Sequence, residues 1–164
     1  MSIRVNTIYL FAILLYNYTN RRHRIIVAGS DIAFPAHTSN IKRGHHMEKE
    51  ESRKLAGIAV RALEDKLASD IKVIEIDAIS PLADYFVIAT GRNVNQTDAM
   101  VDGVEEAATK AGFEPDHIEG HHNANWTLLD YKGVIVHIFD EESRGFYDLD
   151  RLWKDGTEID PNTL

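Results

Sequence analysis

A central β-strand covered on both faces is the strongest structural requirement in this sequence. Residues Tyr85–Thr90 form an uninterrupted apolar run of strand length, and Gly91-Arg92-Asn93 ends it. A strand that alternates between apolar and polar residues can face water on one side, whereas a strand that is apolar throughout needs cover on both sides. The run therefore predicts a sheet with protein packed above and below it.

Three segments have the apolar spacing of three and four residues that is typical of amphipathic helices. They cover residues 49–68, 95–111 and 141–153. Asn93 or Asn95 can cap the second helix, and Gly112 can end it in the left-handed conformation. After the third helix, Asp155-Gly156 begins a polar tail.

Four further segments are rich in β-branched and aromatic residues, as strands are. They cover residues 71–77, 113–119, 126–131 and 134–140. Lys132-Gly133 separates the last two segments by the length of a tight hairpin turn. Together with the central run, they predict an α/β (α+β) domain with a mixed sheet of about five strands flanked by helices.

Charge divides the chain into two parts. Residues 1–46 carry six basic side chains and one acidic one, whereas residues 47–164 carry 12 basic and 25 acidic side chains, a net charge of −13. The first part also contains the apolar run Ile8–Tyr16, which is too short to cross a bilayer as a helix. We expect residues 1–46 to be a basic extension, either upstream sequence translated from an early start or a targeting segment. Residues 47–164 are expected to be the folded domain, with no membrane association.

Composition and motifs exclude several kinds of chemistry. The chain has no cysteine, which excludes disulfides, thiolate zinc sites, iron–sulfur clusters and a cysteine nucleophile. The phosphate-binding loop, the dinucleotide fingerprint and the nucleophile elbow are all missing from the sequence. The net charge of −8 also opposes nucleic-acid binding through a generally basic surface. We therefore expect no cofactor.

Several histidines lie in or near the predicted hairpin, and together with Asp130 they are candidate ligands for a metal ion. They are His117, His121, His122 and His137. Their spacing matches no ordered ligand motif, such as two histidines one helical turn apart with a carboxylate. Solvated loop histidines are the favoured interpretation.

Asp148 and Asp150 are spaced like a pair of acids that could hold a metal ion on a strand. Here they fall in a helical pattern, in which residues two apart point to different sides. We interpret them as part of a solvated helix face.

His137 differs from the other histidines because it lies within a strand. The period of two places it on the same face as Ile135 and Phe139. Such a histidine is either a satisfied, partly buried side chain or the middle of an exposed apolar patch used for binding. The pattern alone leaves both interpretations open.

Aromatic residues are concentrated in the last quarter of the chain. They are Trp126, Phe139, Phe146, Tyr147 and Trp153. This density, with few catalytic candidates, suggests recognition of a partner surface, and the alternative is the core of a small α/β domain. Strand alternation places Trp126, Leu128 and Asp130 on one face, so an aromatic and an acid can be displayed together. An apolar patch rimmed by acids predicts a basic protein partner rather than RNA.

Several motifs follow one another in order between about residues 52 and 153. They are Ala83–Gly91, Glu119-Gly120, Trp126–Tyr131, Val134–Phe139, Glu142–Arg144 and Tyr147–Trp153. In these motifs the chain resembles the ribosomal silencing factor family, also called RsfS or Iojap-like. Residues 1–46 lie outside the resemblance.

The resemblance implies a nucleotidyltransferase-like fold without catalytic acids, no enzymatic activity and a tendency to form homodimers. We also expect no metal, because the histidine spacing matches no ligand motif. It implies binding to the large ribosomal subunit through one of its proteins, number fourteen in the L series, at the surface that faces the small subunit. Steric blocking of subunit joining would then damp translation when nutrients are scarce. The expected location is the cytoplasm, or an organelle if residues 1–46 are a transit segment.

The resemblance also implies a set of partner-binding residues, carried over position by position. They are Trp126, Leu128, Asp130, His137, Phe139, Tyr147 and Leu149. Asp84 and Glu142 are expected at the rim of the contact. Arg92–Thr97 departs from the family pattern, which has a serine and then an Arg-His pair, so any contact of that basic pair would be altered.

Two other classes of function compete with this one. A nucleotidyltransferase-type enzyme would need strand-borne carboxylates near a Gly-Ser turn, and the sequence offers neither. A metal-binding regulator would use the loop that contains His117, His121 and His122.

Overall fold

The computed structural model of the chain defines residues 47–120 and 125–164; the predicted extension, residues 1–46, lies outside them, as do His121 and His122. The helices are α2 (Lys49–Asp65), α3 (Val94–Lys110), α4 (Glu141–Tyr147) and α5 (Leu149–Leu152), with a 3-10 turn η1 (Pro161–Thr163). The strands are β1 (Ser69–Glu75), β2 (Tyr85–Gly91), β3 (His117–Glu119), β4 (Trp126–Asp130), β5 (Val134–Asp140) and β6 (Thr157–Ile159).

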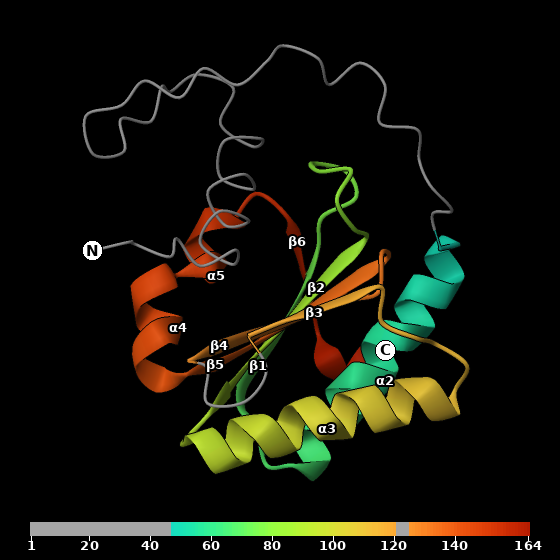
Figure 1. Cartoon of the computed structure of the whole chain (residues 1–164). Coiled ribbons are helices and arrows are strands. Elements are labelled where there is room, and N and C mark those ends of the chain that lie inside the picture. The colour runs from blue at the N-terminus through green and yellow to red at the C-terminus, as the bar shows by residue number, and fades with distance from the viewer. Residues whose placement is uncertain (1–46, 121–124) are drawn as a thin grey trace, which may run out of the picture.

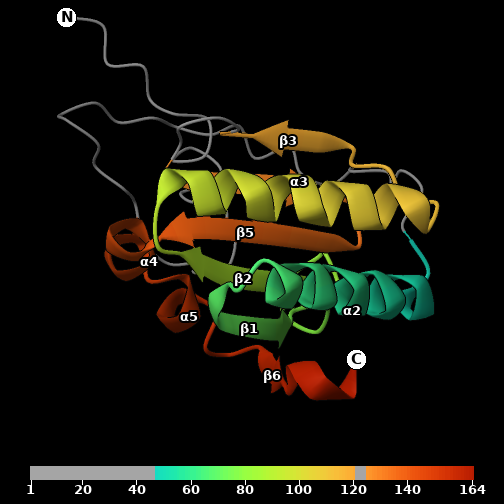
Figure 2. The same ribbon diagram turned by 90° about the horizontal axis from the view of Figure 1, so that it is seen from below.

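The six strands form one sheet in the order β3-β4-β5-β2-β1-β6. It is mixed, as predicted, because β2 and β5 run parallel at its centre while the other neighbours run antiparallel. Figure 2 shows α2 and α3 side by side along one face of the sheet. Every residue of β2 is buried, which confirms the prediction of a central strand covered on both faces.

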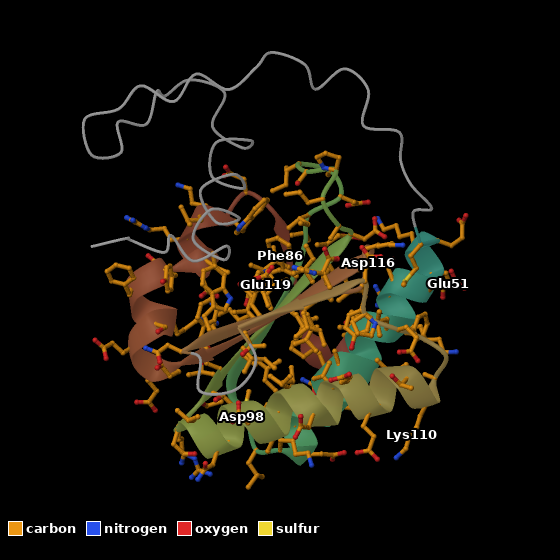
Figure 3. The ribbon with its side chains drawn as sticks, in the orientation of Figure 1. Glu51, Phe86, Asp98, Lys110, Asp116 and Glu119 are labelled. Carbon is orange, nitrogen blue, oxygen red and sulfur yellow. The ribbon has the colours of Figure 1, made fainter. Side chains whose placement is uncertain are left out.

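Alternation along β5 divides the core into two parts. Val134 and Val136 pack under α2 and α3. Ile135 and Phe139 face the opposite side and join a second cluster to which α5 contributes Leu149. Figure 1 shows α4 and α5 on this opposite side. In Figure 3, Phe86 of β2 lies across the sheet from α3, which carries Asp98 and Lys110.

The ends of α3 confirm the predicted capping residues. The side-chain oxygen of Asn93 accepts a hydrogen bond of 2.9 Å from the backbone N–H of Gln96. Asn93, and not Asn95, is therefore the cap. Gly112 follows the helix with a φ of +89°, a conformation that costs glycine little because it has no Cβ.

The single helix expected over residues 141–153 is wrong, because the chain forms two short helices there. Asp148 separates α4 from α5 in the left-handed conformation, with φ 45° and ψ 51°. In one continuous helix, Phe146, Leu149 and Trp153 would share a face. The break instead leaves Phe146 75% exposed while Leu149 and Trp153 are buried against the sheet.

The polar tail expected from Asp155-Gly156 is also wrong, since Thr157–Ile159 adds a sixth strand beside β1. Gly156 permits this close approach, because a Cβ there would lie 2.6 Å from a methyl carbon of Ile74. The strand expected at 113–119 is shorter, covering only His117–Glu119. In the part of the chain that the structure defines, no helix is both long and apolar enough to cross a membrane.

Candidate partner-binding surface

The predicted hairpin of β4 and β5 brings the first group of expected contact residues together. Trp126 lies opposite Phe139, and Leu128 lies opposite His137. The rings of Trp126 and Phe139 are stacked, with centroids 4.8 Å apart and an angle of 26° between their planes. Tyr147 of α4 packs on Trp126 with a centroid distance of 4.6 Å. The hairpin and α4 thus build one aromatic cluster.

A hydrogen bond inside this cluster determines which ring nitrogen of His137 carries the proton. The indole Nε1 of Trp126 donates to His137 Nδ1 at 3.2 Å. A ring nitrogen that accepts carries no proton, so the neutral ring holds its proton on Nε2. Burial, and then the positive charge of Arg144, lower the pKa of His137 to about 3. His137 is therefore neutral at physiological pH.

Most of the expected contact residues are buried, so the alternative of an exposed aromatic patch on the hairpin is wrong and the alternative of a domain core is correct there. Five of them are each at most 4% exposed: Trp126, Leu128, His137, Phe139 and Leu149. Tyr147 packs on Trp126, and Trp153 is buried in the same cluster. The partly buried residues that pack against this cluster also include Ile79, Leu82 and Leu152. Of the two interpretations of His137, burial is correct, but the ring is fully rather than partly buried, and its Nε2 has no hydrogen-bond partner among the described residues.

The acids expected at the contact occupy different environments. Asp84, expected at the rim, is 4% exposed, and its carboxylate accepts a hydrogen bond of 2.6 Å from Ser52 Oγ. Asp130 accepts one of 2.7 Å from the backbone N–H of Lys132, which stabilises the hairpin turn, and burial raises the pKa of Asp130. Glu142 is exposed in the first turn of α4.

Phe146 is an exposed aromatic residue that the sequence prediction of contacts did not include. It is 75% exposed, and its ring stands at 90° to that of Tyr147, with centroids 5.1 Å apart. Glu142 and Phe146 are four residues apart on α4 and so lie on one side of that helix. We call Glu141, Glu142, Phe146 and Tyr147 the α4 surface. It is an aromatic pair, resting on a buried aromatic cluster, beside two exposed acids.

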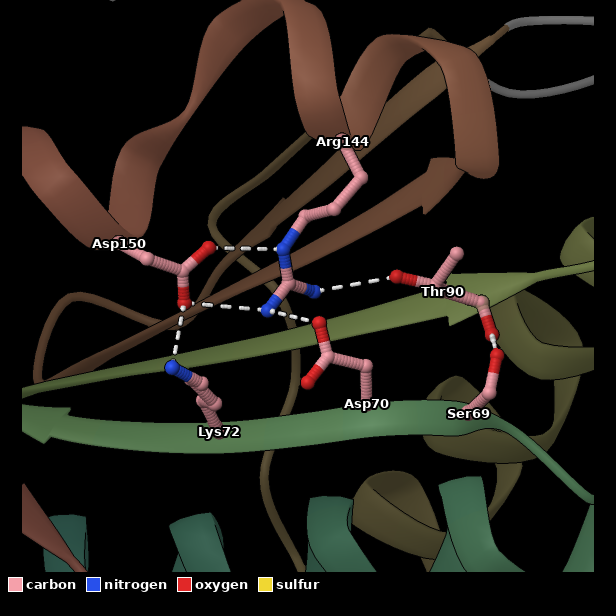
Figure 4. Close-up of polar contacts among 6 residues, drawn as sticks. All are labelled: Ser69, Asp70, Lys72, Thr90, Arg144 and Asp150. Carbon is pink, nitrogen blue, oxygen red and sulfur yellow. Dashed lines mark hydrogen bonds and ion pairs between the residues drawn. The ribbon is translucent and has the colours of Figure 1, made fainter.

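The interpretation of Asp150 as part of a solvated face is wrong. Its carboxylate receives two hydrogen bonds, of 2.8 and 3.1 Å, from the buried guanidinium of Arg144 (Figure 4). Partial burial alone would raise the pKa of Asp150, but the hydrogen bonds and charge of Arg144 and the charge of Lys72 hold it below its ordinary value. Asp148, in contrast, breaks the helix and pairs with Arg151 at 3.0 Å.

The described residues contain no group of three or more side chains suited to hold a metal ion. His117 instead contacts Glu119, its neighbour two residues along β3. His121 and His122, which the metal hypothesis also needs, lie outside the described residues.

Comparisons with known proteins identify the family of this chain. Residues 49–164 match the family model described as ribosomal silencing factor during starvation. A ribosomal silencing factor RsfS from Halalkalibacterium halodurans is 32% identical over 109 residues, which cover 66% of this chain and 93% of that protein. A crystal structure of a Chromobacterium violaceum protein is 32% identical, has a TM-score of 0.60, and the match covers 70% of this chain and 92% of that one.

A mouse protein is also similar, with 30% identity over 97 residues that cover 57% of this chain and 42% of the mouse protein. It is named mitochondrial assembly of ribosomal large subunit protein 1. With the family model matching more than half of its length, this chain belongs to the ribosomal silencing factor family.

Proposed function

We propose that this chain is a translational repressor that binds the large ribosomal subunit and sterically blocks joining of the small subunit when nutrients are scarce. Membership of the silencing-factor family supports the repressor role. The name of the mouse relative, which refers to the large subunit, supports the choice of subunit. The protein partner proposed on that subunit is number fourteen in the L series, on the basis of the family resemblance.

The observation that carries the proposal is the α4 surface, where exposed Phe146 stands on half-buried Tyr147. An aromatic anchor of this kind contributes strongly to binding energy when a partner buries it. Exposed Glu141 and Glu142 beside it favour a basic protein and repel bare RNA. The net charge of −13 over residues 47–164 acts in the same direction.

The proposal gives the expected contact residues two different roles. Tyr147 and Glu142 contact the partner directly, together with Phe146. The buried residues support this surface from below by holding α4 in place: Trp126, Leu128, His137, Phe139 and Leu149. Asp84 and Asp130 stabilise the fold and take no direct part.

The remaining parts of the proposal rest on the family. A silencing factor is a regulator, so we propose that the chain has no enzymatic activity. Homodimer formation stays a prediction to which we assign no surface. The proposed location is that of the target ribosome, which is the cytoplasm unless residues 1–46 are a transit segment.

Co-sedimentation of the full chain with purified large ribosomal subunits tests the proposal. We expect Phe146→Ala to weaken binding at least about tenfold, as removal of a central aromatic anchor does. Leu67→Ala is the matched control, because Leu67 is 72% exposed but lies at the turn between α2 and β1. Equal binding by wild type and Phe146→Ala, or no binding by the wild type in moderate salt, would contradict the proposal.

A further inference from the structure

Arg144 of α4 is a buried cation that joins four elements of the fold. Its side chain is 8% exposed. The guanidinium makes two hydrogen bonds to Asp150 of α5, a hydrogen bond of 3.2 Å to Thr90 Oγ1 of β2, and an ion pair of 3.2 Å with Asp70 of β1. Figure 4 shows these partners arranged around the three guanidinium nitrogens, with Lys72 3.6 Å from Asp150.

The helix that carries Arg144 needs such an attachment. α4 has seven residues and α5 has four, and helices of this length are not stable in water without tertiary contacts. The left-handed residue Asp148 between them also breaks the continuity of the helix. At the beginning of α4, the Asp140 side chain accepts a hydrogen bond of 2.7 Å from the backbone N–H of Ser143. Arg144 provides the polar attachment to the sheet and to α5.

The position of Arg144 along α4 links this attachment to the exposed aromatic ring. Residues two apart on a helix point to different sides. Arg144 therefore reaches inward to the sheet while Phe146 points outward, 75% exposed. A rotation of α4 that moved the guanidinium away from Asp150 and Asp70 would also turn Phe146 away from its present direction.

We propose that Arg144 is a positioning residue for partner binding: its pairing with Asp150 and Asp70 holds α4 in the one orientation that presents Phe146 to the ribosome. This inference rests on the proposed function, because it takes the α4 surface as the binding site. Arginine suits the role better than lysine does. Its planar fork bonds two carboxylates and a hydroxyl at once, whereas a lysine ammonium is a compact point charge that cannot reproduce the two-pronged bond to Asp150.

A double-mutant cycle between Arg144 and Phe146 tests the inference, with binding of the full chain to large ribosomal subunits as the measurement. We expect Arg144→Gln to weaken binding about tenfold in the wild-type background and to have almost no further effect when Phe146 is already alanine. Arg144→Lys should recover part of the loss, because it keeps the charge. Arg151→Gln is the matched control, since Arg151 is a 79% exposed cation on α5 in a surface ion pair.

The outcomes of the cycle distinguish a failure of the proposed function from a failure of the positioning role. If Phe146→Ala alone leaves binding unchanged, the proposed function fails. If Phe146→Ala weakens binding but Arg144→Gln weakens it by the same factor in both backgrounds, or not at all, the positioning role is overturned while the proposed function stands. Should Arg144→Gln not fold, the same cycle is run with Asp70→Asn, whose side chain is 58% exposed in the wild type. Coupling to Phe146 is expected there too, and its absence overturns the inference.

Discussion

The indole of Trp126 donates a hydrogen bond of 3.2 Å to Nδ1 of His137, across the β4–β5 pair. The two residues are diagonal neighbours, since Trp126 lies opposite Phe139 and His137 lies opposite Leu128. The bond occurs in a fully buried environment, where an unpaired polar atom is costly. It therefore ties the stability of the aromatic cluster to the neutral form of one histidine.

Trp126→Phe should destabilise the domain by about 1–3 kcal/mol more than Trp153→Phe does, because it leaves the buried Nδ1 of His137 without a donor. Trp153 is a fitting control, since it is 2% exposed in the same cluster and packs on Phe86. Urea unfolding of both variants measures the difference. Equal losses of unfolding free energy would show that the hydrogen bond contributes nothing beyond the size of the ring.

Acid should destabilise the wild type more steeply than it destabilises His137→Asn. The pKa of His137 is about 3 in the folded protein and near 6.5 in the unfolded chain. Between these values the unfolded chain binds a proton that the folded chain does not, so the free energy of unfolding falls as pH falls. Below pH 6, the free energy of unfolding of the wild type should fall faster than that of His137→Asn, and the difference in slope should approach about 1.4 kcal/mol per pH unit. Unfolding curves of both proteins, measured from pH 7.5 to 4.5, test this prediction. An equal loss of unfolding free energy in the two proteins would contradict it.

Gly133→Ala should destabilise the protein by about 1–3 kcal/mol, as overpacking does. A Cβ at Gly133 would lie 2.1 Å from Ser52 Oγ and 3.0 Å from the Cβ of Met47, so it would push on the hydrogen bond between Ser52 and Asp84. Thermal unfolding measures the effect.

Gly145→Ala is the matched control for Gly133→Ala, because nothing lies within 4 Å of a Cβ at this helical position. Alanine there should stabilise α4 by about 0.5–1 kcal/mol. Similar melting temperatures for the two variants would show that the Gly133 contact is not as tight as the distances indicate.

Patterns in the sequence predicted those parts of the fold that depend on neighbouring residues in the chain. The apolar run Tyr85–Thr90 and the alternation along Val134–Phe139 correctly indicated a buried sheet and its two faces. Alternation says which residues share a face but not what covers that face, so the burial of Trp126 was not predictable. Neither was β6, because Thr157–Ile159 pairs with a strand far away in the sequence.

The candidate site was only partly predictable for a related reason. Aspartate tolerates the left-handed conformation but does not require it, so no local signal marks Asp148 as the break between α4 and α5. Without that break, Phe146 falls on the buried side of a longer helix. Glu142 and Tyr147 were identified through the family motifs, and their contact with a partner stays a prediction.

Salt should weaken binding to the large subunit. The exposed acids Glu141 and Glu142 are expected to attract a basic partner, and dissolved ions screen such charges over about 8–10 Å. Glu141→Gln with Glu142→Gln should reduce both the association rate and its dependence on salt. Surface plasmon resonance at two salt concentrations measures both, and an unchanged salt dependence in the double variant would place the acidic contact elsewhere.

Subunit joining in the presence of the full chain tests the central claim most directly. Purified large and small ribosomal subunits are mixed under conditions that favour joining, and the joined fraction is read from a sucrose gradient. With wild type or Leu67→Ala present, we predict fewer joined ribosomes and protein that sediments with free large subunits. With Phe146→Ala, joining should proceed almost as it does without the protein. Undiminished joining with wild type bound to the joined ribosomes would contradict the account.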